Sequence, residues 1–381
     1  MRLIGLVSGT SADGIDAALI RLEGKKPPVL EAFVLLPFPA ALRGRVLGVA
    51  GGAAVGAPEI AALDVELGEL FARAALAVAR KAGVAISAVS AIGSHGQTIH
   101  HAPRARPATT MQIGDPSVIA ERTGVTVVAD FRRRDVAAGG EGAPLVPMAH
   151  LQLFGEPGRG RAVQNLGGIG NVTVLPGKGG VNGVFAFDTG PANMLLDALV
   201  RVFSGGRRRF DRNGATSAKG EPDEKLLGEL LREPFFRRAP PKSTGRELFG
   251  RAYVSRLIAE GRRRHLQPEE LLATAAELTA RSIAISYERF VLPKAKVREC
   301  LLCGGGVHNR DVVARIAGHL RPLGIETKST EDFGVDPDAV EAIAFALLAW
   351  DTLSGRAGNI PRATGARGPR ILGSIVPGAL E

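Results

Sequence analysis

The sequence predicts an α/β fold made of two similar halves, and three observations support this class. Predicted strands and helices alternate along the chain. Two stretches, within residues 3–21 and 161–177, each have the pattern of a strand, a glycine-containing turn and a second strand. The chain has 381 residues, which is more than one hydrophobic core usually serves, so two domains are expected.

The first half contains six predicted strands and one long helix. The helix extends from about Pro58 to Lys81, because proline suits a first helical turn and Gly83 follows as a stop signal. The strands are predicted from apolar runs and from alternation of apolar residues, at 3–7, 15–21, 29–36, 88–94, 109–113 and 125–129.

The turn in "GLVSGTSADGIDAALI", residues 5–20, is rich in hydroxyl groups and glycine. Gly9 and Gly14 let backbone amides approach an anion, and Ser8, Thr10 and Ser11 add hydroxyl donors. A Walker-type loop is excluded because no Gly-Lys-Ser/Thr ending and no following helix are present. The turn is either a phosphate-binding element or an ordinary polar hairpin loop.

Two further glycine clusters follow predicted strands in the second half. One lies in "RAVQNLGGIGNVTVLPG", residues 161–177, and the other in "LLCGGGVHN", residues 301–309, where a helix is predicted from about Asn309. Neither paired-strand turn fits G-x-G-x-x-G before a helix, which argues against a dinucleotide fold. If the halves face each other, both turns can bind one polyphosphate in a cleft, and the third cluster can accommodate a flat ring.

Asp188 follows an apolar strand in "VFAFDTGPANMLLDALV", residues 184–200, and precedes a helix predicted to begin at Pro191 or Ala192. Its carboxylate is either an N-terminal cap or a general base for an attacking hydroxyl or water. The Gly-Pro turn beside it favours the second interpretation, because the turn holds amides and carboxylate in one corner.

Two polar segments follow strands, "GSHGQTIHH" at 93–101 and "ADFRRRDVAAGGEGAPLVP" at 129–147. Their mixture of amide, carboxylate and guanidinium groups suits a sugar, and the arginines suit an acidic one. His95 is either a hydrogen-bonded core residue or functional, whereas His100 and His101 are interpreted as structural. No His/Glu spacing on a helix indicates a metal site.

The chain is basic, with 48 Lys and Arg against 38 Asp and Glu and a net charge of +10. Short arginine runs occur at 132–134, 207–209 and 262–264. We interpret them as solvated surface and expect no nucleic-acid partner, because only 2 Tyr and 1 Trp are available for stacking. An anionic small molecule fits the same charge.

The two cysteines, Cys300 and Cys303, have no second Cys/His pair at metal-ligand spacing and are interpreted as buried thiols. The longest uncharged stretch, Ala82 to Pro103, is too polar for a membrane span, and the N-terminus has no secretory pattern. The sequence therefore predicts a cytoplasmic protein without a membrane partner.

Eight runs carry a resemblance to a known family. They occur in the family's order between residue 3 and about residue 350, so the match covers nearly the whole chain. As a set they resemble the anhydro-N-acetylmuramic acid kinases. The runs are SGTSADGID, GSHGQTI, QIGDPSVIAERTG, DFRRRDVAAGGEGAPLVP, QNLGGIGN, FDTGPANMLLD, PKSTGRELF and LLCGGGVHN.

The resemblance implies two ribonuclease-H-like domains of the sugar kinase, Hsp70 and actin superfamily, with a nucleotide cleft between them. The expected division is 1–134 plus about 345–381 for domain I and about 135–344 for domain II. It also implies ATP and Mg²⁺ as cofactors, an amino sugar as substrate, a homodimer, and a role in peptidoglycan recycling. In the implied reaction, water opens the 1,6-anhydro ring of 1,6-anhydro-N-acetylmuramic acid and the freed O6 accepts the γ-phosphoryl group.

Site residues are carried over from the matching runs, with Asp188 as the catalytic base and no residue assigned as a metal ligand. The implied substrate contacts are Gln97, Asp130, Arg132 and Glu341. The implied ATP contacts are Gly9, Thr10, Ser11, Ala12, Asp13, Gly14, Ile15, Asp16, Asn165, Gly167, Gly168, Gly304, Gly305, Gly306 and Asn309.

Three positions depart from the family's usual residues. Ala12 replaces a larger apolar residue and is expected to be harmless. Ala192 replaces glycine, which is acceptable if the position has negative φ. Glu141 stands where glutamine is common and would repel an anionic sugar unless an arginine pairs with it.

Three alternatives to this reaction follow from the same sequence. A sugar kinase of the superfamily would phosphorylate a free hydroxyl without consuming water. An ATP-driven switch protein of the actin or Hsp70 kind would need a partner-binding domain. A basic nucleic-acid binder is the most distant of the three.

Overall fold

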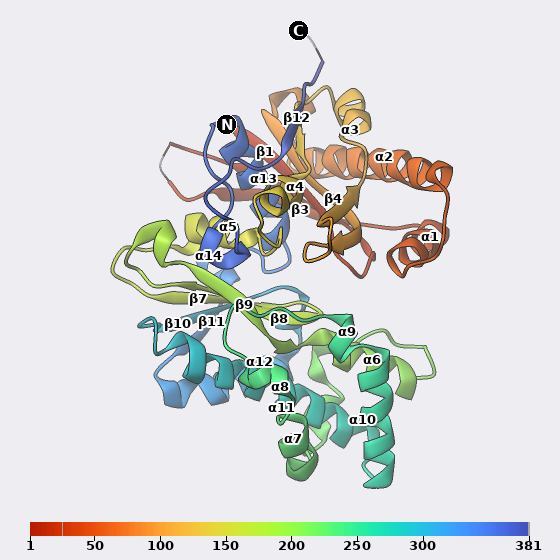
Figure 1. Ribbon diagram of the computed structural model, residues 1–381, viewed down its shortest axis with the longest axis vertical. Helices are drawn as coiled ribbons and strands as arrows, with labels where there is room; N and C mark the ends of the chain where they lie inside the picture. Colours follow the sequence, from red (N-terminus) through yellow and green to blue (C-terminus); the bar gives the residue numbers. More distant parts are fainter. Residues whose placement is uncertain (25, 380–381) are drawn as a thin grey trace. The chain divides into compact units, whose positions relative to one another are not determined.

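The computed structural model describes residues 1–24 and 26–379, and it separates into two compact units, each with its own sheet (Figure 1). Unit 1 consists of Met1–Leu153 and Gly334–Glu381, and unit 2 of Phe154–Phe333. Unit 2 is thus a single stretch of chain inserted between the two segments of unit 1.

The sheet of unit 1 has seven strands in the order β12-β6-β4-β1-β2-β3, with β5 paired to β4. Strands β1, β2 and β3 are antiparallel neighbours, whereas β4 is parallel to β1 and β6 is parallel to β4. The bounds are β1 (Arg2–Ser8), β2 (Gly14–Arg21), β3 (Val29–Pro37), β4 (Ala91–Ala102), β5 (Thr109–Ile113), β6 (Val127–Ala129) and β12 (Ser374–Val376).

The sheet of unit 2 has five strands in the order β11-β10-β7-β8-β9. Again three antiparallel strands are followed by two parallel ones, β10 beside β7 and β11 beside β10. This shared order is that of a ribonuclease-H-like sheet and confirms the prediction of two similar α/β halves. The bounds are β7 (Arg161–Leu166), β8 (Ile169–Leu175), β9 (Phe185–Pro191), β10 (Glu299–Cys303) and β11 (Glu326–Ser329).

Helices cover both sheets, and short 3₁₀ turns and one π turn connect them. Unit 1 holds α1 (Ala40–Ala50), α2 (Ala57–Lys81), α3 (Pro116–Thr123), α4 (Phe131–Ala137), α5 (Val146–Phe154), α13 (Val340–Leu353) and α14 (Pro361–Thr364). Unit 2 holds α6 (Asn193–Phe203), α7 (Glu224–Leu230), α8 (Pro234–Arg237), α9 (Arg246–Phe249), α10 (Arg251–Arg263), α11 (Pro268–Ser286) and α12 (Arg310–Leu320). In the described part of the chain, no helix has the length and apolarity needed to cross a bilayer.

The six strands predicted in the first half are present, and α2 confirms the long helix. The expected end of the fourth strand was wrong, because β4 continues to Ala102 and includes the polar segment 93–101. Helix α1 was not predicted, since glycines at 44 and 48 interrupt its pattern. The helix after Asp188 begins at Asn193, two residues beyond Pro191.

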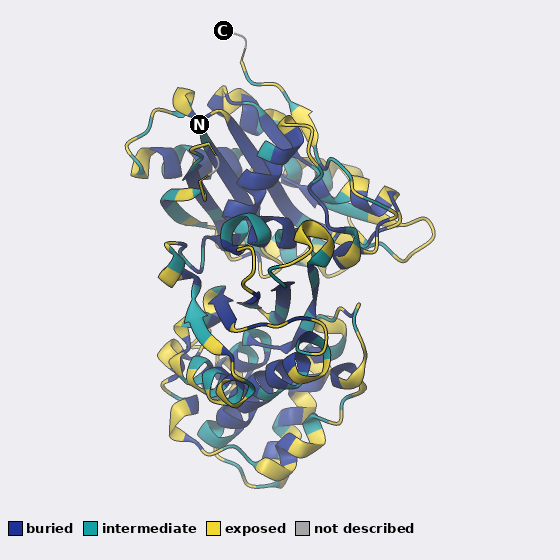
Figure 2. Cartoon of the chain, turned by 90° about the vertical axis from the view of Figure 1, so that its left-hand side faces the viewer, coloured by how far each residue is buried: buried dark blue, intermediate teal, exposed yellow. Residues whose placement is uncertain are grey.

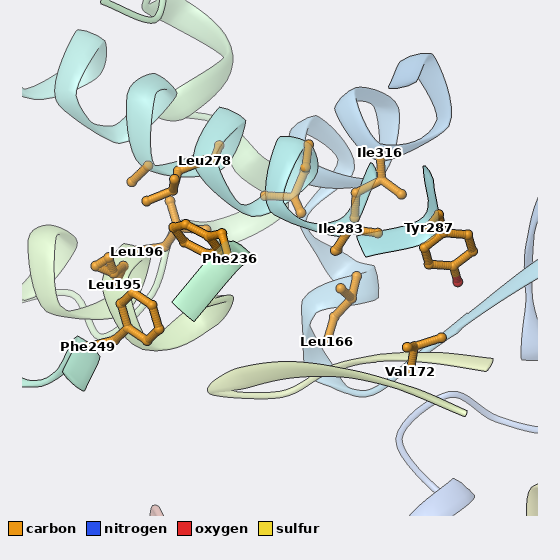
Figure 3. Close-up of a cluster of buried hydrophobic side chains, with 14 of the residues drawn as sticks. Leu166, Val172, Leu195, Leu196, Phe236, Phe249, Leu278, Ile283, Tyr287 and Ile316 are labelled. Carbon is orange, nitrogen blue, oxygen red and sulfur yellow. The ribbon is translucent and has the colours of Figure 1, made fainter. Parts of the chain in front are cut away.

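Each unit has its own hydrophobic core, and buried residues concentrate on its strands and on the inner helix faces (Figure 2). In unit 2, α11 is buried along most of its length. Figure 3 shows Phe236 and Phe249 of this core beside Leu195 and Leu196 of α6, and the two phenylalanine rings lie 5.9 Å apart.

Residues 135–153 and 334–344 belong to unit 1, so the observed boundaries differ from those expected at about 134/135 and 344/345. The contacts of Asp135 explain one difference. Its Oδ1 accepts hydrogen bonds from Asn359 Nδ2 at 2.7 Å and Thr364 Oγ1 at 2.8 Å. The other difference arises because α13 packs on β1 and β4. Residues 334–344, which lead into α13 and form its start, therefore belong to unit 1.

Candidate active site

The turn between β1 and β2 is closed by a hydrogen bond from Ala12 N to Gly9 O at 3.0 Å. Arg43 of α1 holds it from outside, since its Nη2 donates to Ser11 O at 3.0 Å and lies 2.9 Å from Asp13 Oδ1. A Cβ added at Gly9 would meet only Ser11 Oγ, at 4.0 Å. The backbone at Gly9 is therefore open to a ligand, as a phosphate-binding turn requires.

Ala12 is fully buried and has φ of 49°, in the left-handed region. The sequence interpretation of this alanine as harmless is thus incomplete. A non-glycine residue in this region costs about 1–2 kcal/mol. The hydrogen bond across the turn and the burial of the methyl group offset this cost.

Asp16 lies on β2, immediately after the turn, and its Cα is paired with that of Val7 on β1. Burial, together with the negative charges of Glu341 and Asp338, raises the pKa of its carboxyl group to about 7. Three carboxylates thus act on one another in unit 1. Asp338 was not singled out from the sequence, although it precedes α13 in the same acidic run as Glu341.

Close helix packing positions Glu341 in the first turn of α13. The helix backbone lies directly on β1 and β4, at two glycines. A Cβ at Gly5 would lie 1.8 Å from Ala342 O, and one at Gly93 would lie 2.0 Å from Phe345 O. Only glycine permits this approach, so the sequence of β1 and β4 decides where Glu341 lies.

Arg132 and His95 form a hydrogen-bonded pair in unit 1. Arg132 Nε donates to His95 Nε2 at 2.9 Å, and Arg132 Nη1 donates to Gly142 O at 2.6 Å. His95 Nδ1 lies 3.0 Å from Gly96 O, so Nδ1 carries the proton and Nε2 accepts. Burial and the charge of Arg132 hold the pKa of His95 well below its usual range.

The guanidinium of Arg132 is held among buried groups. Burial lowers the pKa of Arg132 to about 10, and the nearby charges of Glu341 and Asp135 oppose the shift. Arg132 and Glu341, both predicted substrate contacts, therefore lie in the same electrostatic environment as Asp16.

Gln97 and Asp130, the other two predicted substrate contacts, already have partners within unit 1. Gln97 Oε1 accepts from Ser8 Oγ at 2.6 Å, and its Nε2 donates to Thr98 O at 3.1 Å. Asp130 has φ of 59° and lies 3.1 Å from Arg133 Nε. Gln97 thus lies at the start of the turn between β1 and β2, which the sequence alone did not indicate.

Glu141 forms an ion pair with Arg104 at the protein surface. This is the pairing that the sequence interpretation required for a carboxylate close to an anionic sugar. Arg104 itself was not predicted, because it lies in a loop whose sequence, "APRARP", contains no recognisable motif.

In unit 2 the parallel pairing of β7 with β10 brings two predicted ATP segments together. Asn165 is the Cα partner of Cys303, so Gly304 lies next to it. Gly304 has φ of 79°, and a Cβ there would lie 2.2 Å from Asn165 Oδ1. A Cβ at Gly305 would meet nothing within 4 Å, so the backbone at Gly305 is open to a flat ligand.

The turn between β7 and β8 supports the start of α6. The carbonyl groups of Gly167 and Gly168 accept hydrogen bonds from the amides of Asn193 at 3.0 Å and Met194 at 3.1 Å. Asn309 caps α12, because its Oδ1 accepts from Val312 N at 3.1 Å. Helix α12 begins at Arg310, six residues after Gly304, and the amides at its N-terminus favour negative charge.

Asp188 lies within β9, an edge strand of the sheet in unit 2. Its amide donates to Lys242 O at 3.1 Å, and its Oδ2 accepts from Thr244 N at 2.8 Å. The N-cap of α6 is Ala192, so Asp188 is not a helix cap, and φ at Ala192 is −128°, negative as expected for alanine there. Lys242 and Thr244 belong to the run "PKSTGRELF", to which the sequence analysis gave no role.

Cys300 and Cys303 are buried thiols, as predicted. Burial raises the pKa of Cys300 to about 12, and its Sγ lies 3.1 Å from the Tyr287 hydroxyl. Among the residues that the structure describes, no group of three or more His, Cys, Asp or Glu side chains is close enough to bind a metal ion directly.

A family model described as anhydro-N-acetylmuramic acid kinase matches residues 1–378. The chain belongs to this family. It is 47% identical to the anhydro-N-acetylmuramic acid kinase of Gloeobacter violaceus, over 98% of both chains. It is 44% identical to that of Caldanaerobacter subterraneus subsp. tengcongensis, over 98% of this chain and 96% of the relative.

Solved structures similar to this chain include a ROK family glucokinase from Streptomyces griseus, in complex with glucose and AMPPNP. It is 12% identical, covers 91% of this chain and 99% of its own, and has a TM-score of 0.42. The activator of the 2-hydroxyisocaproyl-CoA dehydratase from Clostridium difficile is 13% identical. It covers 93% of this chain and 96% of its own, with a TM-score of 0.48.

Proposed function

We propose that the protein is an ATP-dependent kinase that converts 1,6-anhydro-N-acetylmuramic acid and water to N-acetylmuramic acid 6-phosphate, in peptidoglycan recycling. The observation that carries this proposal is the family match over residues 1–378. Water adds to C1, the bond from C1 to O6 breaks, and O6 takes the γ-phosphoryl group of ATP to give ADP. A kinase acting on the free hydroxyl of another sugar would not consume this water.

In this reaction Asp188 is the base that takes a proton from the attacking water. An ordinary sugar kinase deprotonates a hydroxyl of its substrate, but here the 6-oxygen is part of an acetal and carries no proton. The hydrogen bond from Thr244 N to Oδ2 at 2.8 Å supports this role, because it fixes the orientation of the carboxylate.

ATP binding is assigned to backbone groups of both units. In unit 1 the segment Gly9–Asp16 would contact phosphates, supported by the open backbone at Gly9. In unit 2 the segment Asn165–Gly168 would contact phosphates, and Gly304–Gly306 would lie beside the adenosine, supported by the open backbone at Gly305. Asn309 would act by capping α12, whose N-terminus favours the negative charge of ATP.

The residues of unit 1 fit Mg²⁺, which when bound neutralises and orients the phosphates of ATP. The fit is electrostatic. Burial and the negative charges of Glu341 and Asp338 raise the pKa of Asp16, and a cation would stabilise its ionised carboxylate. Asp16 would hold the ion together with waters and phosphate oxygens, in keeping with the preference of Mg²⁺ for few protein ligands.

Sugar recognition is assigned to Arg132 and Glu341, with Gln97 and Asp130 in supporting roles. The lactyl carboxylate of the substrate needs a cationic partner, and Arg132 is held in place by His95 and Gly142. We further propose that the protein is a cytoplasmic homodimer, which the family resemblance supports. Sedimentation velocity with and without ATP would test the dimer.

The decisive assay supplies ATP, Mg²⁺ and 1,6-anhydro-N-acetylmuramic acid in ¹⁸O-labelled water, with the product analysed by mass spectrometry. A 6-phosphorylated sugar with one heavy oxygen at C1 is expected. Phosphorylation of N-acetylmuramic acid without label, and no conversion of the anhydro sugar, would instead establish an ordinary sugar kinase. ATP binding without turnover of either sugar would favour the switch-protein alternative.

A further inference from the structure

Lys242 is a buried cation that the reaction described above does not use. Its side chain is only 3% exposed, and it lies in the loop between α8 and α9. The acceptor for its Nζ is a backbone carbonyl, Phe235 O at 3.2 Å. A buried ammonium group is costly unless its surroundings compensate for lost hydration.

Three aromatic rings provide that compensation. The Nζ atom lies 4.6 Å from the ring centroid of Phe235, 4.8 Å from that of Phe290 and 5.8 Å from that of Phe187. Attraction between a cation and an aromatic face is strongest in such desolvated places. We call Lys242 and these three rings the lysine cage.

The lysine cage is connected to Asp188 in two ways. Phe187 precedes Asp188 on β9, so one ring of the cage and the carboxylate share the same strand. The loop residues held by the cage also contact Asp188, since Lys242 O accepts from its amide at 3.1 Å and Thr244 N donates to its Oδ2 at 2.8 Å. Because β9 is an edge strand, this loop is what satisfies the outward amide of Asp188.

We propose that Lys242 is a positioning residue for the catalytic carboxylate: its ammonium group, held in the lysine cage, fixes the loop whose backbone orients Asp188. This role rests on the proposed function. Burial lowers the pKa of Lys242 to about 8, and the negative charge of Asp188 opposes this change, which agrees with a cation close to the base. Lys242 acts through the loop and does not touch the reacting atoms.

The test compares steady-state kinetics of wild type, Lys242→Met, Lys242→Arg and Phe290→Leu. Lys294→Met is the matched control, because Lys294 lies 5.7 Å from the Phe185 ring of the same strand but is exposed. We expect Lys242→Met to lower kcat by about 10- to 100-fold, the range for a misplaced catalytic group, with the KM for ATP within about twofold of wild type. Lys242→Arg should restore part of kcat, Phe290→Leu should lower it less, and Lys294→Met should leave it unchanged.

An unchanged kcat in a folded Lys242→Met protein, or a raised KM with normal kcat, would overturn the proposal. If Lys242→Met does not fold, Phe290→Leu decides, and a normal kcat in that variant overturns the proposal. A folded wild type that turns over no anhydro sugar would instead refute the proposed function itself, and this role with it. Circular dichroism and ATP binding of each variant separate these outcomes.

Discussion

The two units share one strand order but use their carboxylates differently. Asp16 in unit 1 lies on the second strand among other acids, and their repulsion contributes to its raised pKa. Asp188 in unit 2 lies on the third strand, and a loop donates a backbone hydrogen bond to it. The same strand order therefore carries a carboxylate among other acids in one unit and a carboxylate oriented by a loop in the other, because the surrounding elements and not the strand order decide the environment of each acid.

The largest expected effect is the loss of kcat on substitution of Asp188, the acid of unit 2. Asp188→Asn should lower kcat by about 10²- to 10⁴-fold, the usual contribution of a general base, while the affinity for ATP changes little. Turnover and calorimetric ATP binding are the measurements. Glu326→Gln, which alters an exposed acid on β11 of the same sheet, is the control. Loss of ATP binding in Asp188→Asn would contradict the division of roles between the units.

Replacing the acid of unit 1, Asp16, should increase the stability of the folded protein. The carboxyl group of Asp16 has a pKa of about 7 in the folded protein against 3.8 for an ordinary aspartate, so the folded state binds the proton more tightly between these values. The free energy of unfolding should therefore decrease as pH rises from about 4 to 7 and level off above that. Asp16→Asn should remove this decrease and stabilise the ligand-free protein at pH 8 by about 1–3 kcal/mol, and we expect it to impair catalysis.

Thermal unfolding of wild type and Asp16→Asn between pH 5 and 8 would measure this effect. Glu121→Gln is a matched control, because Glu121 is an exposed acid of the same unit. A parallel pH dependence in wild type and Asp16→Asn would show that Asp16 is not the titrating group.

A smaller effect is expected from substitution of His95, which holds Arg132 in unit 1. His95→Asn shortens the side chain and leaves Arg132 Nε without its acceptor, at a cost of about 1–3 kcal/mol for an unsatisfied buried donor. The KM for the anhydro sugar should rise more than the KM for ATP. His100→Asn, at an exposed position of the same strand, should change neither. Equal effects of the two substitutions would contradict a role for His95 in holding Arg132.

The smallest effect is expected at Glu141. The ion pair with Arg104 is largely exposed, and such pairs contribute about 0.2–1 kcal/mol. Glu141→Gln should therefore change the melting temperature and the KM for the sugar only slightly. A marked fall in that KM would mean that the carboxylate repels the substrate despite Arg104.

The sequence predicted the sheets better than the helices that connect them. Apolar runs mark β1, β2 and β3 clearly, and their positions were confirmed. The end of β4 was missed because Ser94, His95 and Gln97 are polar but buried by tertiary packing, which no local pattern reveals. Helix α1 was missed because its apolar residues have no clear helical periodicity.

The candidate site could be predicted where its residues are neighbours in sequence. The glycine turns and Asp188 belong to short recognisable runs. The residues that hold these side chains in place could not be predicted, because they act through contacts between positions that are distant in sequence. Lys242 meets Asp188 from another loop, and Asn359 and Thr364 meet Asp135 from beyond the whole of unit 2.

The insertion of unit 2 into unit 1 determines the order in which a nascent chain can fold. Helix α13, which packs on Gly5 and Gly93, is translated only after residues 154–333 have been made. On the ribosome, β1 and β4 are therefore synthesised early but lack α13, whereas unit 2 is one contiguous stretch and can complete its core first. The unit that begins at the N-terminus is thus the last to be finished, because the part of its sheet at Gly5 and Gly93 is covered only when α13 has been made.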